Sequence, residues 1–299
     1  MEKIFLVANP CSGTLKLKNN LLEIVRVFTQ AGYLVTVYPT QCRRDATHVV
    51  SQLGNEYTMV VCCGGDGTLN EVIAGLMQNK NRYRLGYIPA GTLNEWSSGL
   101  GISRNMISAA KDIVNGNVLP LDIGVFDDKY FTYTASFGAF TDASYSAPQE
   151  VKNILGQAAY IIEGIKSVGN IKPYRMKFYC EGSCAAEGEF LFGSISNSLS
   201  IGGIIKLDRD AVELNDGLFE VLLIKNPENL SQFNRIISCI LKKDFSDPCI
   251  CFFRTDRLSV ETARDIPWTL DGEQAFPRSD NFQIENIRSA VSFYVPRCD

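Results

Sequence analysis

Glycines, hydroxyls and carboxylates are concentrated in one short segment in the first quarter of the chain. The segment is Gly64-Gly65-Asp66-Gly67-Thr68-Leu69-Asn70-Glu71, directly after the apolar run 59–63 and at the start of a helical pattern. Glycines let backbone N–H groups approach an anion closely, and the first turn of a helix adds partial positive charge. This combination is typical of a loop that binds a phosphate chain, with Asp66 available to reach magnesium or to order the loop. The alternative is an ordinary strand-to-helix turn in which Asp66 and Thr68 act as caps.

Two further turns of this kind follow other apolar runs. They are Asn9-Pro10-Cys11-Ser12-Gly13 and Pro89-Ala90-Gly91-Thr92-Leu93-Asn94. Each comes at the carboxyl end of a predicted strand, which is where open parallel sheets bind ligands. One such turn alone is unremarkable in any α/β protein, but three at one edge of a sheet favour a nucleotide. Neither the G-x-x-x-x-G-K-[ST] nor the G-x-G-x-x-G pattern is complete, so the usual mononucleotide and dinucleotide motifs are absent.

Carboxylates in two turns of the second half are the other candidates for chemistry. Asp271 and Glu273 are separated by one glycine after the predicted strand 267–270, and the glycine gives the backbone the freedom to turn both toward one cleft. Asn215-Asp216-Gly217-Leu218 forms the other acidic turn. The alternative for both is a plain hairpin turn, and for the second segment the residues alone favour that alternative.

The elements that must position these residues alternate from residue 1 to about 125. Predicted strands lie at 4–8, 33–38, 58–63 and 85–88, and predicted helices at about 15–28, 45–53, 69–77 and 103–115. Asp45 is expected to cap the second helix. Short apolar strands alternating with helices indicate a parallel sheet covered by helices, an N-terminal three-layer α/β nucleotide-binding domain.

Beyond Pro120 the pattern changes to alternation with a period of two residues. The run 174–180 alternates apolar with polar side chains, and the turn-rich stretch 181–188 leads into 190–195 as in a hairpin. Helices are predicted at 154–168 and 230–241. This half is therefore predicted to be a C-terminal antiparallel, β-sandwich-like domain.

Composition excludes several classes of protein. The 299 residues are 45% hydrophobic and 21% charged with a net charge of −4, which is ordinary for a globular protein and argues against binding nucleic acid through a basic surface. No run approaches the roughly 18 to 20 apolar residues that span a bilayer, and the start has no signal-peptide pattern, so we expect a cytoplasmic protein. The ten cysteines lack paired C-x-x-C spacing and there is one histidine, His48, so no zinc site is expected.

Together these segments resemble the diacylglycerol kinase catalytic-domain family, which is shared with sphingosine kinases and bacterial lipid kinases. The resemblance rests on the glycine-rich segment 64–71, the turns 9–13 and 89–94, and the downstream marks Asn215-Asp216-Gly217-Leu218 and Leu270-Asp271-Gly272-Glu273. It covers essentially the whole chain, in the family's order. It implies a kinase that uses ATP and Mg²⁺ to phosphorylate a hydroxyl of a membrane lipid, with ATP in a cleft between two domains.

The resemblance also implies a role for each matching residue. ATP would be surrounded by Asn9, Pro10, Cys11, Ser12, Gly13, Thr40, Gly65, Asp66, Gly67, Thr68, Leu69, Asn70, Glu71 and Thr92. A structural Mg²⁺ would be held by Asp216 with backbone oxygens near Glu213 and Leu218, since this ion prefers hard oxygen ligands. Glu273 would accept the proton of the lipid hydroxyl, and Asp271 would support it or contact metal.

The implied domains are 1–125 with a last strand at about 289–299 for ATP, and 126–288 for the lipid substrate. A lipid that stays in the bilayer implies transient peripheral contact with the inner face of the membrane. Candidate cations for that contact are Lys152, Lys166, Lys172, Arg175 and Lys177. Diacylglycerol is the default acceptor, with sphingoid bases, monoacylglycerol and phosphatidylglycerol as alternatives, and a homodimer is the statistical default.

Two segments depart from the family's pattern. Glu95 stands where the family usually has aspartate, and the glycine-rich segment of the second domain is reduced to 197–203. The alternatives are an NAD kinase, which resembles this family and also has a G-G-D-G-T turn, or a non-catalytic nucleotide- or lipid-binding regulatory protein. Asn70-Glu71 and the segment 270–273 favour the lipid kinase over the NAD kinase.

Overall fold

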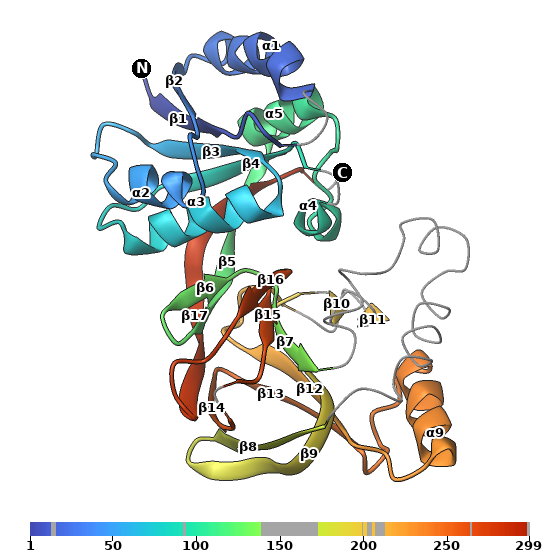
Figure 1. Ribbon diagram of the computed structural model, residues 1–299. Helices are drawn as coiled ribbons and strands as arrows, with labels where there is room; N and C mark the ends of the chain where they lie inside the picture. The colour runs from blue at the N-terminus through green and yellow to red at the C-terminus, as the bar shows by residue number, and fades with distance from the viewer. Residues whose placement is uncertain are drawn as a thin grey trace. The chain divides into compact units, whose positions relative to one another are not determined.

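The computed structural model describes residues 1–12, 16–91, 94–138, 173–198, 200–201, 205–206, 213–263 and 265–297. The chain divides into two compact units, 1–123 with 288–299, and 124–287 (Figure 1). Strands β5 (Asn117–Phe126) and β17 (Asn281–Val295) each run through a boundary, so each contributes residues to both units. We describe the two units separately.

The first unit is built on a parallel sheet. Its strands are β1 (Lys3–Ala8), β2 (Leu34–Pro39), β3 (Met59–Gly64) and β4 (Arg84–Pro89), with the end of β17 beside β4. The order is β2-β1-β3-β4-β17, and every neighbouring pair is parallel. The central strand β3 is buried throughout, which explains its continuous apolar sequence.

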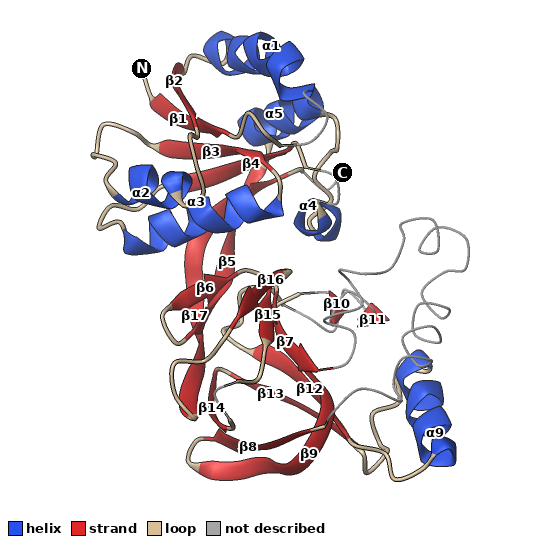
Figure 2. Cartoon of the chain, viewed as in Figure 1, coloured by secondary structure: helices blue, strands red, loops and turns tan. Residues whose placement is uncertain are grey.

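Helices cover both faces of this sheet. They are α1 (Lys16–Gln30), α2 (Asp45–Ser51), α3 (Asp66–Gln78), α4 (Glu95–Gly99) and α5 (Met106–Asn115). In Figure 2, α1 and α5 lie on one face and α2 and α3 on the other. Glycines allow the close packing, because a Cβ on Gly86 of β4 would lie 2.8 Å from Ile113 of α5. The predicted three-layer α/β class is confirmed.

Two predicted helix starts and one predicted helix cap differ from the structure. Asp45 does not precede α2 but is its first residue; Arg44, with a left-handed φ of 67°, stands before it. The carboxylate of Asp45 instead accepts from the N–H of Gln41 at 2.7 Å. Helix α3 begins at Asp66, three residues earlier than predicted, and α5 begins at Met106, three residues later, because the Asn105 side chain accepts from the first-turn N–H groups.

The second unit is antiparallel and rich in strands. Beside parts of β5 and β17, it contains β6 (Lys129–Phe131), β7 (Thr134–Gly138), β8 (Tyr174–Cys180), β9 (Ser183–Ser196), β10 (Ser200–Ile201), β11 (Ile205–Lys206), β12 (Phe219–Lys225), β13 (Ile250–Thr255), β14 (Arg257–Glu261), β15 (Trp268–Leu270) and β16 (Glu273–Ala275). The main order is β16-β15-β7-β9-β8-β14-β17, and β12 pairs with both β9 and β13. The predicted antiparallel β-rich class is confirmed.

In this unit the turn predicted at 181–188 is shorter than expected, and the helix predicted at 230–241 is present. The stretch 181–188 is a turn only at Glu181 and Gly182, which have φ of 49° and 78°; the remainder belongs to β9, because Ser183 already pairs with Cys180. The helix predicted at 230–241 is α9 (Leu230–Leu241), which begins after Asn229, whose side chain accepts from the N–H of Gln232. The helix predicted at 154–168 lies outside the described residues.

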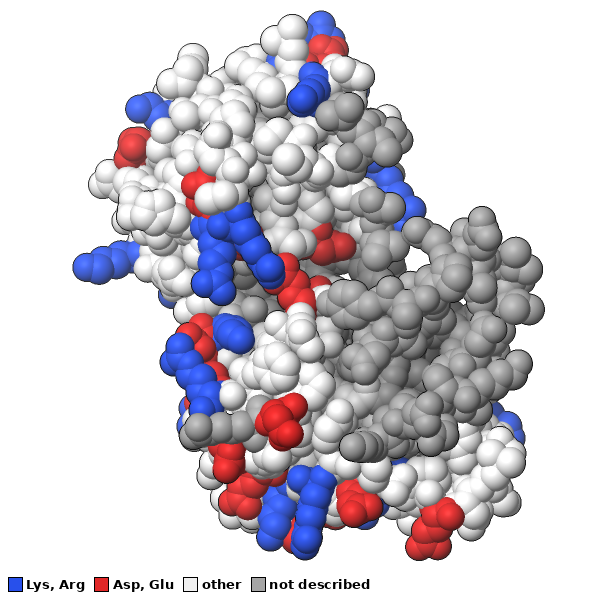
Figure 3. All heavy atoms as spheres, viewed as in Figure 1, with Lys and Arg blue, Asp and Glu red and all other residues white. Residues whose placement is uncertain are grey.

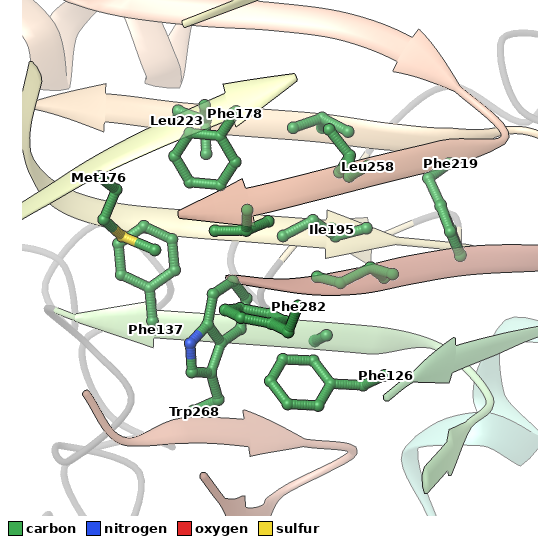
Figure 4. Close-up of a cluster of buried hydrophobic side chains, with 14 of the residues drawn as sticks. Phe126, Phe137, Met176, Phe178, Ile195, Phe219, Leu223, Leu258, Trp268 and Phe282 are labelled. Carbon is green, nitrogen blue, oxygen red and sulfur yellow. The ribbon is translucent and has the colours of Figure 1, made fainter. Parts of the chain in front are cut away.

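Aromatic rings form the core of the second unit (Figure 4). Trp268 is fully buried, with its ring centroid 4.7 Å from that of Phe137, 5.2 Å from Phe126 and 5.6 Å from Phe282. A second apolar cluster lies under α9, where Phe233 and neighbouring side chains of the helix pack against β9, β12 and β13. In the described part of the chain, no helix is long and apolar enough to cross a membrane.

Replacing Phe137 with alanine should lower the free energy of unfolding of the second unit by about 3–5 kcal/mol, because a fully buried ring leaves a cavity. Urea unfolding followed by Trp268 fluorescence measures this in a Trp96→Phe background, since Trp96 is the other tryptophan and lies in the first unit. The control Phe137→Leu should lose clearly less. A midpoint unchanged by Phe137→Ala would contradict the packing.

Candidate active site

Three glycine- and hydroxyl-containing turns meet at the carboxyl edge of the parallel sheet. They follow β1, β3 and β4, which are adjacent strands. The N–H of Asn9 donates to the carbonyl of Cys63 at 2.9 Å, and the N–H of Ala90 donates to the carbonyl of Gly64 at 2.8 Å. Thr40 is held at the same edge, because its N–H donates to the carbonyl of Ala8 at 2.9 Å. The turns that the sequence separates by up to 80 residues are therefore neighbours.

Asn9 joins the first turn to the glycine-rich segment. Its Nδ2 donates to Thr68 Oγ1 at 2.8 Å, while its Oδ1 accepts from the N–H of Cys11 at 2.9 Å. The hydroxyl of Ser12 donates to the Asn9 carbonyl at 2.8 Å. An amide supplies a donor and an acceptor on one side chain, which fits these two contacts. Asn9 thus fixes the first turn against the glycine-rich segment.

Gly65 and Gly91 bring the second and third turns into backbone contact. A Cβ on Gly91 would lie 2.7 Å from Gly65 Cα, closer than real Cβ atoms approach backbone. Gly65 has an extended backbone, with φ of −89°, and directly precedes α3. Gly65 leaves the position directly before this 13-residue helix, whose first residue is Asp66, without a side chain. The partial positive charge of the helix terminus and the two glycines form a cradle suited to a phosphate chain.

Asn94 closes the third turn, and the sequence analysis did not single it out as a site residue. It is buried, with a left-handed φ of 48°. Its Oδ1 accepts from the N–H of Gly91 at 3.0 Å and from the Tyr87 hydroxyl at 3.2 Å, and its Nδ2 donates to the Gly91 carbonyl at 2.7 Å. Asparagine tolerates this backbone better than most residues, which is the signal that could have identified it.

The other predicted ATP residues differ in what their side chains contact. Leu69 is in the core and Thr68 is buried against Asn9, so any contact of Leu69 with a ligand is through its backbone. The Glu71 carboxylate accepts from the N–H of Arg44 at 2.8 Å, which ties α3 to the start of α2. Gly13 and Thr92 lie outside the described residues. The position of ATP between two domains stays a prediction.

Asp271 and Gly272 form the turn between β15 and β16. Their φ values of 48° and 86° are those of a two-residue hairpin turn, for which Asp-Gly is a preferred sequence. Yet this turn is not a surface feature, since Asp271 is 6% exposed. Its carboxylate accepts from Thr132 N–H at 2.6 Å, Thr132 hydroxyl at 2.8 Å, Tyr133 N–H at 2.9 Å and Thr134 N–H at 3.0 Å.

These four donors fill the lone-pair positions of the Asp271 carboxylate. Burial raises the pKa of Asp271 to about 6, although the donors oppose the shift, so the group is ionised at neutral pH. Of the two roles implied for Asp271, support of its neighbours fits this geometry and direct contact with a metal does not. Glu273, the first residue of β16, is exposed instead, so the two carboxylates occupy different surroundings.

The acidic turn before β12 is paired with an arginine side chain from β13. Asp216 Oδ1 accepts from the N–H of Leu218 at 2.8 Å, and Asp216 Oδ2 is paired with the guanidinium of Arg254. Arg254 Nε also lies 3.2 Å from Glu220 Oε1. Glu213 is exposed, and the described residues contain no group of three His, Cys, Asp or Glu side chains suited to a metal. Both oxygens of the one carboxylate expected to hold the structural Mg²⁺ are thus already engaged, so this carboxylate as paired here does not fit the ion.

Charges elsewhere bear on the predicted membrane contact. Lys177 lies 3.0 Å from Glu187, and Arg175 stands opposite Glu189 in the β8–β9 pair. Figure 3 likewise shows acidic side chains interspersed with basic ones on the face in view. Lys152, Lys166 and Lys172 lie outside the described residues, so the membrane contact stays a prediction.

Asp122 is a buried carboxylate that the sequence analysis did not consider. It is fully buried in β5, and its Oδ1 accepts from the N–H of Ser289 at 2.6 Å. This bond ties β5 to β17 where the chain returns to the first unit. An aspartate between the apolar residues Leu121 and Ile123 was the signal in the sequence that could have identified it.

Replacing Gly91 with alanine should weaken ATP binding about tenfold or more, because the new Cβ forces the two glycine turns apart. Calorimetry or a fluorescent ATP analogue measures this. Gly99→Ala is the matched control, since its Cβ would meet nothing within 4 Å. Binding by Gly91→Ala within about twofold of the unsubstituted protein would contradict the cradle.

Replacing Asp271 with asparagine should lower the free energy of unfolding of the second unit by about 1–3 kcal/mol, because the amide N–H₂ would face the N–H donors of 132–134. Urea unfolding followed by Trp268 fluorescence measures the loss. The exposed neighbour supplies the control, Glu273→Gln, which should unfold at the original midpoint. Equal midpoints for both variants would show that Asp271 does not hold the turn.

Comparisons with known proteins agree with this geometry. Residues 3–126 match the family described as the diacylglycerol kinase catalytic domain, and residues 135–286 match the YegS C-terminal NAD kinase beta sandwich-like domain. A Bacillus subtilis protein named diacylglycerol kinase is 34% identical over 91% of this chain and 90% of its own length. A Staphylococcus aureus protein of the same name is 29% identical over 97% and 91%.

A solved structure of a Bacillus anthracis protein, described as a "putative diacylglycerol kinase", superimposes with a TM-score of 0.79. It is 26% identical in sequence, and the match covers 98% of this chain and 95% of that one. The relatives thus share both halves of the chain and their order. The chain belongs to the diacylglycerol kinase family and is a kinase.

Proposed function

We propose that this kinase transfers the γ-phosphate of ATP to the free hydroxyl of diacylglycerol, which gives phosphatidic acid and ADP. The observation that carries the proposal is the cradle formed by Asn9, Gly65 and Gly91 at the N-terminus of α3. It is supported by the relatives named diacylglycerol kinase, which match nearly the whole chain.

The cradle suits the charge of ATP. Backbone N–H groups and a helix N-terminus favour anions without a cationic side chain, and they approach most closely where glycines remove the Cβ. In the proposed reaction Mg²⁺ enters with ATP as part of the substrate, where it neutralises the β- and γ-phosphate oxygens. The protein then has mainly to position the phosphate chain, because most of the rate in phosphoryl transfer comes from positioning and charge neutralisation.

Glu273 is the proposed proton acceptor. The lipid hydroxyl oxygen attacks the γ-phosphorus, the bond from that phosphorus to the β-phosphate oxygen breaks, and the hydroxyl proton passes to the Glu273 carboxylate. Glu273 is exposed and stands two residues after Asp271, whose buried hydrogen bonds hold the turn. A glutamate on a rigid turn keeps its carboxylate in place with less loss of conformational entropy.

The proposed acceptor follows the names of the relatives, which are diacylglycerol kinases. Diacylglycerol keeps its acyl chains in the bilayer, and the kinase must then act at the membrane surface. Transient peripheral contact is therefore part of the proposal. NAD kinase activity is the rival, because NAD kinases share the glycine-rich turn.

The test is phosphoryl transfer from radiolabelled ATP with Mg²⁺ to mixed micelles containing diacylglycerol, monoacylglycerol, sphingosine or phosphatidylglycerol, with NAD in a parallel reaction. Label should appear in phosphatidic acid. Glu273→Gln should lower kcat by about 10²–10⁴-fold, the range of a general base, with little change in KM for ATP. Glu228→Gln, a change at another exposed glutamate of the second unit, should leave kcat unchanged.

Each other outcome has a definite meaning. Transfer to NAD alone would overturn the proposed acceptor in favour of NAD kinase. Transfer to sphingosine or to a different glycerolipid would replace diacylglycerol and keep the mechanism. ATP binding without transfer to any acceptor would favour a regulatory protein that has kept the fold.

A further inference from the structure

Arg254 is paired with the carboxylate at which a metal ion was expected. The acidic turn 215–218 resembles a structural magnesium site, yet its Asp216 carboxylate is paired with a guanidinium. Arg254 stands on β13, directly opposite Glu220 on β12, and Asp216 precedes Glu220 by four residues. One cation therefore joins a turn to the strand that follows it.

The burial of the two carboxylates explains why a cation is needed there. The side chain of Glu220 is 2% exposed and that of Asp216 is 16% exposed, whereas Arg254 is 38% exposed. Two carboxylates that are removed from water need a positive partner, or they lose hydration without compensation. Glu220 Oε2 is buried and has no hydrogen-bond partner among the described residues, so the pairing with Arg254 is its main compensation.

The donor set suits a guanidinium better than Mg²⁺. Magnesium requires near-octahedral oxygen ligands at short distances, whereas a guanidinium offers several N–H donors in one plane to separate carboxylates. Asp216 Oδ1 is already used by the Leu218 N–H, and Oδ2 by Arg254. A divalent ion bound to the same oxygen would lie beside a permanent positive charge.

The position of this cluster in the sheet gives it structural importance. Glu220 is the register partner of Ser196 on β9, and Ser196 is the register partner of Thr134 on β7. Register partners in antiparallel strands have their side chains on the same face of the sheet. The N–H of Thr134 donates to Asp271. Neighbouring residues on β13, β12, β9 and β7 therefore form a line across the sheet from Arg254 to Thr134, which is hydrogen-bonded to the turn that carries Glu273.

We propose that the guanidinium of Arg254 takes the place of a structural divalent ion at the Asp216 turn. Its pairing with Asp216 and Glu220 then stabilises the second unit without a metal. The proposal is independent of which lipid is phosphorylated. In this scheme the Mg²⁺ used in catalysis enters with ATP, and removal of free divalent ions from the nucleotide-free protein leaves the turn intact.

The test compares thermal unfolding of nucleotide-free protein in EDTA with unfolding in Mg²⁺ or Ca²⁺, with metal binding measured by calorimetry. The unsubstituted protein should unfold within about 1 °C in all conditions. Arg254→Met, which removes the charge and keeps a long side chain, should unfold several degrees lower in EDTA and regain part of the loss in Mg²⁺ or Ca²⁺. Arg254→Lys should stay closer to the original without metal.

Two variants make the test specific. Asp216→Asn combined with Arg254→Met should abolish the metal response, because the ligand of the introduced ion is gone. Arg257→Met is the matched control, since Arg257 pairs with Glu285 at the surface of the same unit at 3.1 Å. It should neither lower the unfolding temperature appreciably nor create a response to metal.

Two results would overturn the proposal. The first is metal-dependent stability or metal binding in the unsubstituted protein that Asp216→Asn abolishes, and it can be measured even if Arg254→Met does not fold. The second is a folded Arg254→Met protein that neither Mg²⁺ nor Ca²⁺ stabilises. Neither result would bear on the transfer of phosphate to diacylglycerol, which the lipid assay measures separately.

Discussion

The first unit is organised around a place where two stretches of backbone touch. Gly65 and Gly91 approach so closely that a methyl group on Gly91 would not fit, and this contact is made where β3 and β4 end side by side. Two asparagines keep the neighbouring turns in place. Asn9 links the first turn to Thr68, and Asn94 closes the third turn through a hydrogen bond to the Gly91 carbonyl. A phosphate chain can be held by backbone amides only where no side chain intervenes, so the absence of Cβ atoms is the feature that the surrounding structure preserves.

The two acidic turns of the second unit show how one local pattern serves different purposes. Both contain an Asp-Gly pair at a reversal of the chain. The Asp271 carboxylate accepts four hydrogen bonds from residues 132–134, which lie at the start of β7 and just before it. These bonds hold the turn in place. At Asp216 the carboxylate is matched by an arginine from another strand. In neither case is the aspartate a bare carboxylate facing solvent, which leaves Glu273 as the exposed acidic group of the 270–273 segment.

Local features of this protein could be predicted from sequence, and long-range partners could not. Helix α9 was predicted with the bounds it has, because the apolar spacing that indicates it lies within the helix itself. The three glycine turns could be placed at one edge because parallel strands end together. The partners of Asp271 are about 140 residues away in the sequence, and Arg254 is 38 residues from Asp216. No periodicity or motif connects such pairs, since strand pairing alone brings them together. The start of α3 was predicted three residues too late because glycines have low helix propensity, although Asp66, Gly67 and Thr68 belong to the helix.

The path of β17 has a consequence for how the protein is made. Its first part pairs with β14 in the second unit, and its last residues pair in parallel with β4, as Phe293 does with Leu85. A sheet that carries the nucleotide cradle thus receives one of its strands from residues that are synthesised after most of the second unit. Domains commonly fold during synthesis in the order in which they emerge from the ribosome. Here the first unit cannot be completed before the second unit has been synthesised, because its sheet lacks one strand until the end of β17 has left the ribosome.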